Sequence, residues 1–421
     1  MEKILRTIER LIPKKIYKFF QPAYHILLAV TGTIIYRRPS RHIYVIGITG
    51  TKGKSSTTEF VNAVLEGAGK KTAILSTIRF KVGDKTRPNK YKMTMPGRFF
   101  TQKFLHDAVK EKCEYAIIEM TSEGARFYRH LGVELDALIF TNLSPEHIES
   151  HGSFKKYKEA KLRLVKQLAK SKKPIRLSIA NIDNEHASSF LISPVEKNIG
   201  YSMKNVHILS ETSISTMIDF HGTKINIPLP GKFNVSNAIA ALTLAQELNI
   251  SLDDAKKGIE SLSIIRGRVE RIDEGQNFSV IVDYAHTDDS LRKLYETFPS
   301  SRKIAVLGGT GGGRDSWKRP ILGKIADEYC DEIIVTNEDP YDEDPLKIIN
   351  EVASGVTKHA SKIIVDRREA IAHAISIARA GDTILITGKG TDPYIMGPRG
   401  TKIVWDDATV AREELKKVLN K

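Results

Sequence analysis

The sequence predicts an α/β protein built from two parallel-sheet domains, preceded by a short helical extension. Short apolar runs, typical of buried strands, alternate with segments of helical periodicity along most of the chain, which indicates parallel sheets covered by helices on both faces. One strand–loop–helix segment near residue 50 is rich in glycine, as are loops that bind phosphate groups. With 421 residues, 41% of them hydrophobic, the chain is long enough for two or three domains.

The first domain is predicted to begin after Ser40, where the pattern changes to short apolar runs. Each run has the length of a buried strand, and the segments between the runs repeat apolar residues with helical spacing. The strand candidates are residues 43–48, 115–119 and 137–142, and the helix candidates are residues 57–68 and 100–110. Residues 175–229 alternate weakly and contain many turn residues, so we expect an insertion of short strands there. We place this domain at residues 41–267.

A second alternation of strands and helices starts near Arg268. The spacing predicts another doubly wound unit, similar in fold to dinucleotide-binding domains. The strand candidates are residues 279–284, 303–307, 332–336, 362–365 and 383–387, and the helix candidates are residues 290–297, 319–329, 345–357 and 368–379. We therefore predict a Rossmann-like domain at residues 268–421.

Composition narrows the class of protein. The two cysteines, Cys113 and Cys330, lie far apart without metal-ligand spacing, which argues against a disulfide framework or a zinc site and fits a cytoplasmic protein. The formal net charge of +15 suits nucleic acid, an anionic membrane or an anionic substrate as a partner. Because the sequence has no nucleic-acid-binding motif and no basic patch interleaved with aromatic residues, we expect no nucleic acid partner.

The first 40 residues are predicted to be a helical extension that is both basic and apolar. The apolar run, residues 22–36, is about 15 residues long, short of the roughly 20 that span a bilayer, and it lacks the small-residue cleavage site of a signal peptide. Basic residues bracket this run, namely Lys14, Lys15, Lys18, Arg37, Arg38 and Arg41. Two interpretations stay open: a helix that packs on the next domain, or a helix that lies in a membrane interface with its cations at anionic headgroups.

The glycine-rich segment, residues 47–56, predicts a site for a nucleotide polyphosphate. It follows a strand and opens a helix, so backbone N–H groups and the helix N-terminus can cradle phosphates. Lys54 would reach the β- and γ-phosphates, and the Ser55 hydroxyl would bind Mg²⁺. Ile48 stands where the generic P-loop has glycine, so the loop is a variant. Glu119 closes an apolar run without a packing reason, which makes it a candidate Mg²⁺ ligand. The predicted ATP-binding loop residues are Gly50, Thr51, Lys52, Gly53, Lys54, Ser55 and Ser56.

Further motifs follow the loop in order along the chain. They are TNLSPEHIESHG at residues 141–152 with Tyr157 and Lys161 beyond it, GKFNVSNA at 231–238, GRVER at 267–271, VDYAHT at 282–287, GRD at 313–315, KRP at 318–320 and GKG at 388–390. Together with the loop and Glu119, these motifs resemble the Mur ligases of cell-wall peptide synthesis. The resemblance covers roughly residues 41–419. Within the family, the sequence is most similar to the ligases that add the third residue of the stem peptide.

The resemblance implies roles for individual residues. His147 matches a histidine that ligates a second Mg²⁺, and Lys161 matches a lysine that becomes carbamylated so that its new carboxylate helps to hold the metal. The implied catalytic residues are Lys54, Glu119, His147 and Lys161, and the implied metal ligands are Ser55, Glu119, His147 and Lys161. The positions implied for adenine, ribose and phosphate contacts are Asn234, Asn237, Arg268, Asp283 and Tyr284. Those implied for the peptide and amino-acid substrates are Thr94, Thr121, Ser122, Arg129, Asp339, Tyr341, Gly388 and Asp392.

The sequence departs from the family pattern at two places. Members of this branch of the family carry an N-terminal domain that holds the uridine nucleotide. Only about 40 residues precede the first strand here, which is too few for such a domain, because domains generally contain about 50 residues or more. Diaminopimelate-adding members carry an Asp-Asn-Pro-Arg signature, whereas this chain has Glu-Asp-Pro-Tyr at residues 338–341. Tyr341 cannot make the bidentate contact of an arginine with a carboxylate. Thr391 and Asp392 also replace the usual histidine and glutamate after Gly390, so lysine or another amino acid stays open as the substrate.

We therefore expect an ATP-dependent and Mg²⁺-dependent ligase that activates a peptide carboxylate, that of a muramoyl-dipeptide precursor, as an acyl phosphate and couples it to an amino acid. A hinge near Gly267 and Arg268 would close the two domains around the reaction and exclude water. The alternatives are a ligase of folylpolyglutamate or polyglutamate type and a non-catalytic ATP-binding subunit at the membrane. We expect a cytoplasmic monomer with small-molecule substrates, and peripheral membrane contact through residues 1–40.

Overall fold

The computed structural model describes residues 14–146, 148–191, 194–314 and 316–419, with side chains from residue 21 onward. Contacts divide the chain into two compact units, which are described separately below. Unit 1 comprises residues 1–146 and 154–201, and unit 2 comprises residues 147–153 and 202–421. The domain boundaries that we predict at residues 40 and 267 stay predictions.

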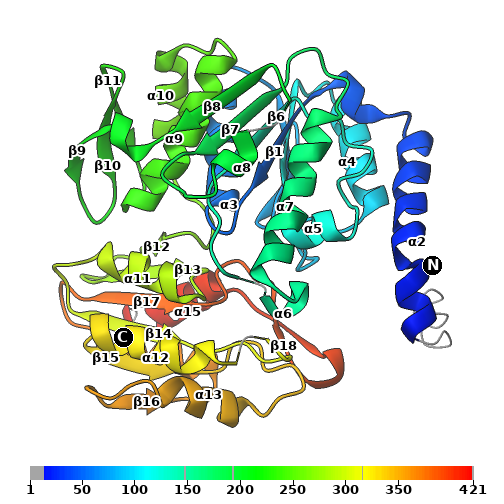
Figure 1. The fold of residues 1–421 in the computed structure, drawn as a ribbon. Helices are drawn as coiled ribbons and strands as arrows, with labels where there is room; N and C mark the ends of the chain where they lie inside the picture. Colours follow the sequence, from blue (N-terminus) through cyan, green and yellow to red (C-terminus); the bar gives the residue numbers. More distant parts are fainter. Residues whose placement is uncertain (1–13, 147, 192–193, 315, 420–421) are drawn as a thin grey trace. The chain divides into compact units, whose positions relative to one another are not determined.

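Unit 1 is a layered α/β unit around one large sheet (Figure 1). Its strands are β1 (Tyr44–Thr49), β2 (Thr72–Leu75), β3 (Arg79–Val82), β4 (Lys85–Pro88), β5 (Tyr115–Glu119), β6 (Ala137–Phe140), β7 (Leu177–Asn181) and β8 (Lys197–Tyr201). Its helices are α2 (Lys14–Ile35), η1 (Pro39–His42), α3 (Lys54–Gly67), α4 (Arg98–Lys110), α5 (Ser122–Arg126), α7 (Phe154–Ala169) and α8 (Ser188–Leu191).

The unit 1 sheet has the strand order β4-β3-β2-β5-β1-β6-β7-β8, and all neighbours from β2 to β8 run parallel. The central strands are apolar runs buried on both faces, as parallel strands covered by helices must be. Alternate residues of β1 show this: Val45 packs in a core with α4 and α7, while Ile46 lies on the opposite face, where α3 packs on β1 and β5. The carboxyl ends of β2, β5, β1 and β6 therefore meet at one edge of the sheet.

Helix α2 forms an outer layer of unit 1. It packs on α4, which itself packs on β2 and β3 (Figure 1). No helix among the described residues is long and apolar enough to cross a membrane. The apolar run predicted at residues 22–36 is thus the second half of a helix that is seated on the neighbouring domain.

Unit 2 contains a small antiparallel sheet, a pair of helices and a second doubly wound sheet (Figure 1). Its strands are β9 (His207–Glu211), β10 (Thr216–Phe220), β11 (Thr223–Ile227), β12 (Glu270–Ile272), β13 (Ser279–Asp283), β14 (Lys303–Leu307), β15 (Glu332–Val335), β16 (Ser361–Ile363), β17 (Thr383–Thr387), β18 (Tyr394–Met396) and β19 (Lys402–Val404). Its helices are α6 (Ile148–His151), η2 (Met203–Asn205), α9 (Lys232–Glu247), α10 (Leu252–Glu260), α11 (Asp288–Glu296), α12 (Lys318–Tyr329), α13 (Pro345–Ala353), α14 (Arg367–Ile377), η3 (Pro398–Gly400) and α15 (Asp407–Leu419).

The large sheet of unit 2 has the order β12-β13-β17-β14-β15-β16, and only β12 is antiparallel to its neighbour. Helices cover both faces. One core contains Leu291 of α11 and Leu322 of α12, and the other contains Ile371 of α14 and Ala411 of α15. This arrangement confirms the predicted α/β class with a parallel-sheet central domain and a Rossmann-like C-terminal domain.

The predicted strands at residues 115–119, 303–307 and 383–387 coincide with β5, β14 and β17. Helix α3 begins at Lys54, earlier than the predicted start at residue 57, because the periodic apolar pattern appears only after the polar first turn. The region predicted as an insertion, residues 175–229, contributes strands to two different sheets. β7 and β8 extend the parallel sheet of unit 1, and only β9, β10 and β11 form a separate sheet.

Candidate active site

The phosphate-binding loop connects β1 to α3 at the carboxyl edge of the unit 1 sheet. Gly50 has φ 153°, and a Cβ atom there would lie 1.9 Å from the Oγ1 of Thr141. Gly53, with φ 81°, caps the N-terminus of α3. Both positions need glycine, because other residues would clash or be strained. The following serines, Ser55 and Ser56, are buried in the first turn of the helix, where backbone N–H groups favour an anion.

The segment that leaves β6 braces this loop. The Thr51 N–H donates to the Asn142 carbonyl at 2.8 Å, and the Lys52 N–H donates to the Asn142 Oδ1 at 2.9 Å. The Thr141 hydroxyl donates to the Lys52 carbonyl at 2.6 Å, and the Lys52 ammonium pairs with Glu146 at 2.8 Å. The motif at residues 141–146 therefore fixes the shape of the loop.

Two lysines converge on one carbonyl oxygen of the loop. The Gly50 carbonyl accepts from Lys54 Nζ at 3.1 Å and from Lys161 Nζ at 2.7 Å. Lys161 is 1% exposed, so burial lowers the pKa of its ammonium well below the usual value, and the charge of Lys54 lowers this pKa further. Glu146 and Glu119 oppose the shift without cancelling it. Burial therefore favours the neutral form of this amine.

Glu119 lies within a chain of buried and half-buried hydroxyl groups. Its Oε2 accepts from the Ser55 hydroxyl at 3.0 Å and from the Thr77 N–H at 2.9 Å, and its Oε1 accepts from the Thr77 hydroxyl at 3.0 Å. The Thr77 and Thr94 hydroxyl oxygens lie 2.8 Å apart. The carboxylate is thus held between the phosphate loop on one side and a predicted substrate residue on the other.

The other residues predicted to bind the peptide are Thr121, Ser122 and Arg129. Arg129 Nη1 donates to the Met95 carbonyl at 2.7 Å, directly after Thr94 in the chain. Thr121 caps α5 through a bond from the Gly124 N–H, and Ser122 is buried in the first turn of that helix. Burial lowers the pKa of the Arg129 guanidinium, and its Nε has no hydrogen-bond partner among the described residues. The structure brings Thr94 and Arg129 together.

Three residues near the loop escaped the sequence-based prediction of the site. Thr77 follows β2, Glu146 pairs with Lys52, and the Tyr157 hydroxyl lies 3.0 Å from the Thr51 Oγ1. Thr77 lies two residues beyond the end of β2, and no local feature of the sequence marks it as a partner of Glu119. Glu146 and Tyr157 stood within the family motif but had no role assigned.

The metal ligands are only partly described by the structure. His147 lies outside the described residues, so its predicted position as a ligand is untested. Within the described part of the chain, no three His, Cys, Asp or Glu side chains form a group that could hold a metal. The Glu119 carboxylate and the Ser55 hydroxyl, hydrogen-bonded at 3.0 Å beside the phosphate loop, supply oxygen ligands of the kind that Mg²⁺ prefers.

The residues of unit 2 that are predicted to bind the nucleotide lie in two separate parts of the unit. Asn234 and Asn237 are buried in α9, and the Asn234 Oδ1 has no hydrogen-bond partner among the described residues. Asp283, at the end of β13, accepts the backbone N–H groups of Val269 and Ala285, each at 2.7 Å. The Arg268 guanidinium lies over the Tyr284 ring, 4.6 Å from its centroid.

The residues predicted to bind the amino acid gather at the carboxyl ends of β15 and β17. Lys389 is 1% exposed, and its ammonium pairs with Asp339 at 2.8 Å and with Asp392 at 3.1 Å. Tyr341 has φ 54°, and the Arg314 guanidinium lies over its ring, 5.5 Å from the centroid. Gly388 leaves no room for a side chain, because a Cβ there would lie 2.4 Å from a carboxylate oxygen of Glu338.

Comparison with known proteins agrees with this geometry. Residues 48–245 match the Mur ligase middle domain, and residues 267–390 match the Mur ligase glutamate ligase domain. The UDP-N-acetylmuramoyl-L-alanyl-D-glutamate–2,6-diaminopimelate ligase of Syntrophomonas wolfei is 35% identical over 403 residues, 92% of this chain and 81% of the relative. The UDP-N-acetylmuramyl-tripeptide synthetase of a Roseiflexus species is 35% identical over 422 residues, 94% of this chain and 82% of the relative.

Solved structures show the same fold. A UDP-N-acetylmuramoyl-L-alanyl-D-glutamate–2,6-diaminopimelate ligase superposes with a TM-score of 0.61 at 28% identity, covering 90% of this chain and 79% of that one. The folylpolyglutamate synthase of Mycobacterium tuberculosis reaches a TM-score of 0.68 at 14% identity, covering 94% of this chain and 95% of that one. At that identity the second likeness concerns the fold alone.

The fold and the phosphate loop define an ATP-dependent ligase that forms amide bonds. The chain belongs to the Mur ligase family, which carries out this ligation in the synthesis of peptidoglycan precursors.

Proposed function

We propose that this ligase activates the carboxylate of a muramoyl-dipeptide precursor with ATP and joins it to an amino acid. The observation that carries the proposal is the continuous hydrogen-bonded chain from Ser55 through Glu119 and Thr77 to Thr94. It links the loop that would hold the transferred phosphate to the place where the acceptor carboxylate would lie. Phosphoryl transfer between two anions also needs positive charge at the site, which Lys54 and a bound Mg²⁺ would supply.

In the first step, an oxygen of the acceptor carboxylate attacks the γ-phosphorus of ATP. The new bond gives an acyl phosphate, and the bond to the β-phosphate oxygen breaks to release ADP. Lys54, whose ammonium now bonds the loop carbonyls of Gly50 and Thr51 at 3.1 and 2.8 Å, would turn to the phosphates and offset their charge. Ser55 and Glu119 would hold Mg²⁺, which when bound neutralises phosphate charge.

In the second step, the amine of the incoming amino acid attacks the acyl carbon. The C–N bond forms, the C–O bond to phosphate breaks, inorganic phosphate leaves, and the amine loses a proton. Lys161 would support the site as a carbamate. Its neutral amine adds to the carbon of CO₂ and releases a proton, so that a buried neutral group becomes an anion beside the loop. The lowered pKa of Lys161 favours that reaction because only the neutral amine has a free lone pair.

Arg129, Thr94, Thr121 and Ser122 are the proposed peptide-binding residues. Arg129 is the group best suited to a carboxylate. It is partly buried, carries a permanent charge and makes no ion pair with any residue that the structure describes. A planar guanidinium in that state can bind a carboxylate of the peptide through two parallel hydrogen bonds.

In unit 2 we propose Asn234 and Asn237 on the adenine side, and Arg268, Asp283 and Tyr284 toward the ribose and phosphates. The buried Asn234 Oδ1 without a partner is an acceptor that suits the adenine amino group. Asp339, Tyr341, Gly388 and Asp392 form the proposed amino-acid site. Because Tyr341 cannot make two parallel hydrogen bonds to a carboxylate, as an arginine would, we do not expect strict selection of diaminopimelate.

We further propose a cytoplasmic monomer whose partners are small molecules, with residues 1–40 in contact with the inner face of the membrane. Two other functions would use the same fold: a folylpolyglutamate-type ligase, and an ATP-binding subunit without catalysis. The convergence of Lys54, Glu119 and Lys161 on the loop argues against the second, because a non-catalytic subunit would need none of them there.

Phosphate release tests this proposal. We expect release only when a muramoyl-dipeptide acceptor, an amino acid and ATP are all present, and Lys54→Ala should slow it by about a hundredfold to a thousandfold. The control is Lys110→Ala, at an exposed lysine on α4, which should leave the rate unchanged. Phosphate release with a folate acceptor but not with the muramoyl dipeptide would favour a folylpolyglutamate-type ligase. No release with any acceptor would favour an ATP-binding subunit without catalysis.

A further inference from the structure

The outer face of α2 is apolar and exposed in the part of the chain that the structure describes. Between Pro22 and Ile35, every side chain classed as exposed is apolar or aromatic, and none carries a charge. The most exposed are Leu27 at 64%, Ile34 at 63% and Ile35 at 59%, with Val30 at 47%. Leu27, Val30 and Ile34 follow helical spacing and therefore form one stripe. A helix that faces water alone would carry charged residues at such positions.

The inner face of the same helix is fixed to unit 1. His25 packs edge-on against Phe127 with ring centroids 5.6 Å apart, and Tyr36 lies 5.7 Å from His106 of α4. Burial lowers the pKa of His25 to about 4, so this contact is uncharged at neutral pH. At Gly32, an added Cβ would already meet the backbone of Phe99 at 3.6 Å. The helix thus uses one apolar face for docking on the protein and keeps a second one free.

Basic residues flank this stripe in the sequence. The sequence contains no Asp or Glu from Arg10 to Thr58, but it carries cations on both sides of the apolar run, at Arg10, Lys14, Lys15, Lys18, Arg37, Arg38 and Arg41. Arg41 pairs with Glu134 at 2.7 Å. Arg37 and Arg38, both exposed at the end of α2, have no ion pair with any residue that the structure describes.

We propose that this face, the α2 stripe of Leu27, Val30 and Ile34 with Arg37 and Arg38, docks on the surface of an anionic lipid bilayer. The stripe would enter the boundary between headgroups and acyl chains while the arginines bind lipid phosphates. Apolar burial and cationic attraction together give stable but reversible binding, which neither gives alone. The inference rests on the membrane contact proposed for residues 1–40 and does not depend on the ligase reaction.

Charge complementarity favours a bilayer over a protein as the occupant. A partner helix or a second copy of the chain could cover the stripe, but a second copy would bring the same unpaired cations face to face, and like charges repel. An anionic bilayer offers phosphates around the whole rim of the helix, at both of its ends.

Vesicle co-sedimentation of the full chain tests the inference. One set of vesicles contains phosphatidylcholine alone, and the other contains equal parts of phosphatidylcholine and phosphatidylglycerol. We expect binding to the anionic vesicles at low salt, weaker binding at high salt, and little binding to the neutral vesicles. Leu27→Gln with Val30→Gln and Ile34→Gln should lower the partition coefficient about a hundredfold, the equivalent of about 2.7 kcal/mol, because only the exposed part of each side chain, about half of it, is left to bury in the bilayer. Arg37→Gln with Arg38→Gln should lower it about 30-fold, the equivalent of about 2 kcal/mol.

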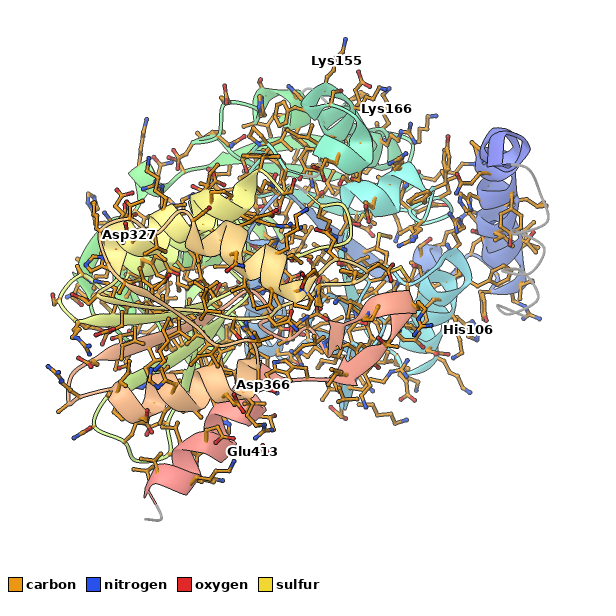
Figure 2. The ribbon with its side chains drawn as sticks, turned by 90° about the horizontal axis from the view of Figure 1, so that it is seen from below. His106, Lys155, Lys166, Asp327, Asp366 and Glu413 are labelled. Carbon is orange, nitrogen blue, oxygen red and sulfur yellow. The ribbon has the colours of Figure 1, made fainter. Side chains whose placement is uncertain are left out.

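Matched control variants distinguish a specific role of the α2 stripe from a general change in the polarity or charge of the protein. Ile175, Ile182 and Ile214 are exposed by 51–56% elsewhere on the chain, so their replacement by glutamine removes similar apolar area. Lys155 and Lys166 project from α7, away from α2 in unit 1 (Figure 2), so Lys155→Gln with Lys166→Gln removes the same charge. Both control variants should bind anionic vesicles like the unchanged protein.

Three outcomes would overturn the proposal. One is no binding to anionic vesicles at low salt. A second is equal loss of binding in the α2 variants and the matched controls. The third is a concentration-dependent dimer that disappears in the Leu27, Val30 and Ile34 variant, which would assign the stripe to a second copy. Thermal unfolding of each variant checks that the fold is intact, and phosphate release is read separately, so failure of the ligase proposal stays distinguishable.

Discussion

Lys161 in unit 1 and Lys389 in unit 2 are equally buried lysines with opposite surroundings. Each is 1% exposed. The Lys389 ammonium lies 2.8 Å from Asp339, 3.1 Å from Asp392 and 2.6 Å from the Tyr394 carbonyl. Lys161 meets a neutral carbonyl at 2.7 Å and the face of the Tyr157 ring, and it makes no ion pair with any described carboxylate.

The difference teaches what burial does to a lysine. A buried ammonium is tolerated when carboxylates compensate it, so Lys389 is a structural cation that ties together the loops after β15 and β17. Without such compensation, burial lowers the pKa of the Lys161 ammonium and so favours the neutral amine, the form that the proposed carbamate chemistry requires. Two lysines of equal exposure can therefore differ in the charge state that their surroundings favour.

The largest effect should come from Lys161→Ala. If Lys161 works as a carbamate, its loss removes an anion from the site, and phosphate release should fall about a thousandfold, or about 4 kcal/mol of transition-state stabilisation. Acetate or formate should restore part of the rate by occupying the vacated space as a carboxylate. Lys166→Ala, at an exposed lysine of the same helix (Figure 2), is the control and should keep full activity. Near-normal turnover of Lys161→Ala would contradict the assignment.

Lys389→Met should mainly lower the stability of the fold and not the rate of the reaction. Removing the cation leaves Asp339 and Asp392 buried without their partner, which should lower the free energy of unfolding by about 3–5 kcal/mol. Denaturant unfolding measures this, with Lys362→Met, an exposed lysine of β16, as the control. A change below about 1 kcal/mol, the range of an exposed pair, would show that the Lys389 cluster is not structural.

The smallest effect concerns amino-acid choice. Competition among diaminopimelate, lysine and other diamino acids in one reaction should show a preference for diaminopimelate below about a hundredfold, because Tyr341 offers no guanidinium. Tyr341→Arg should raise that preference about tenfold, as expected for one added charged hydrogen bond. A strong preference in the unchanged protein would mean that another residue, such as Arg314, binds the distal carboxylate.

The sequence was sufficient for the phosphate loop but not for its surroundings. Strand, glycines and helix start are local features, so residues 47–56 could be predicted together. Glu119 could be predicted as well, because an acidic residue at the end of an apolar run has no packing reason. Thr77 could not, since its bond to Glu119 depends on β2 lying beside β5, which is a property of strand order.

Lys161 was predicted as a site residue only through the family resemblance, and not from its position on a helix. Yet Tyr157, Ala160, Leu164 and Leu168 are buried with helical spacing on α7, and Lys161 stands within that stripe. A charged residue inside an apolar stripe is either paired or functional. Periodicity alone could therefore have placed it in the core, although its neighbour, the Gly50 carbonyl, lies 111 residues away in the chain.

Carbon NMR of the protein in ¹³C-labelled bicarbonate tests the central claim, that Lys161 is a neutral, reactive amine. Unchanged protein should show a single carbamate carbon signal that is absent from Lys161→Ala and present in Lys389→Met, once the latter is shown to be folded. A fully active protein without this signal, or a signal that survives in Lys161→Ala, would contradict the account.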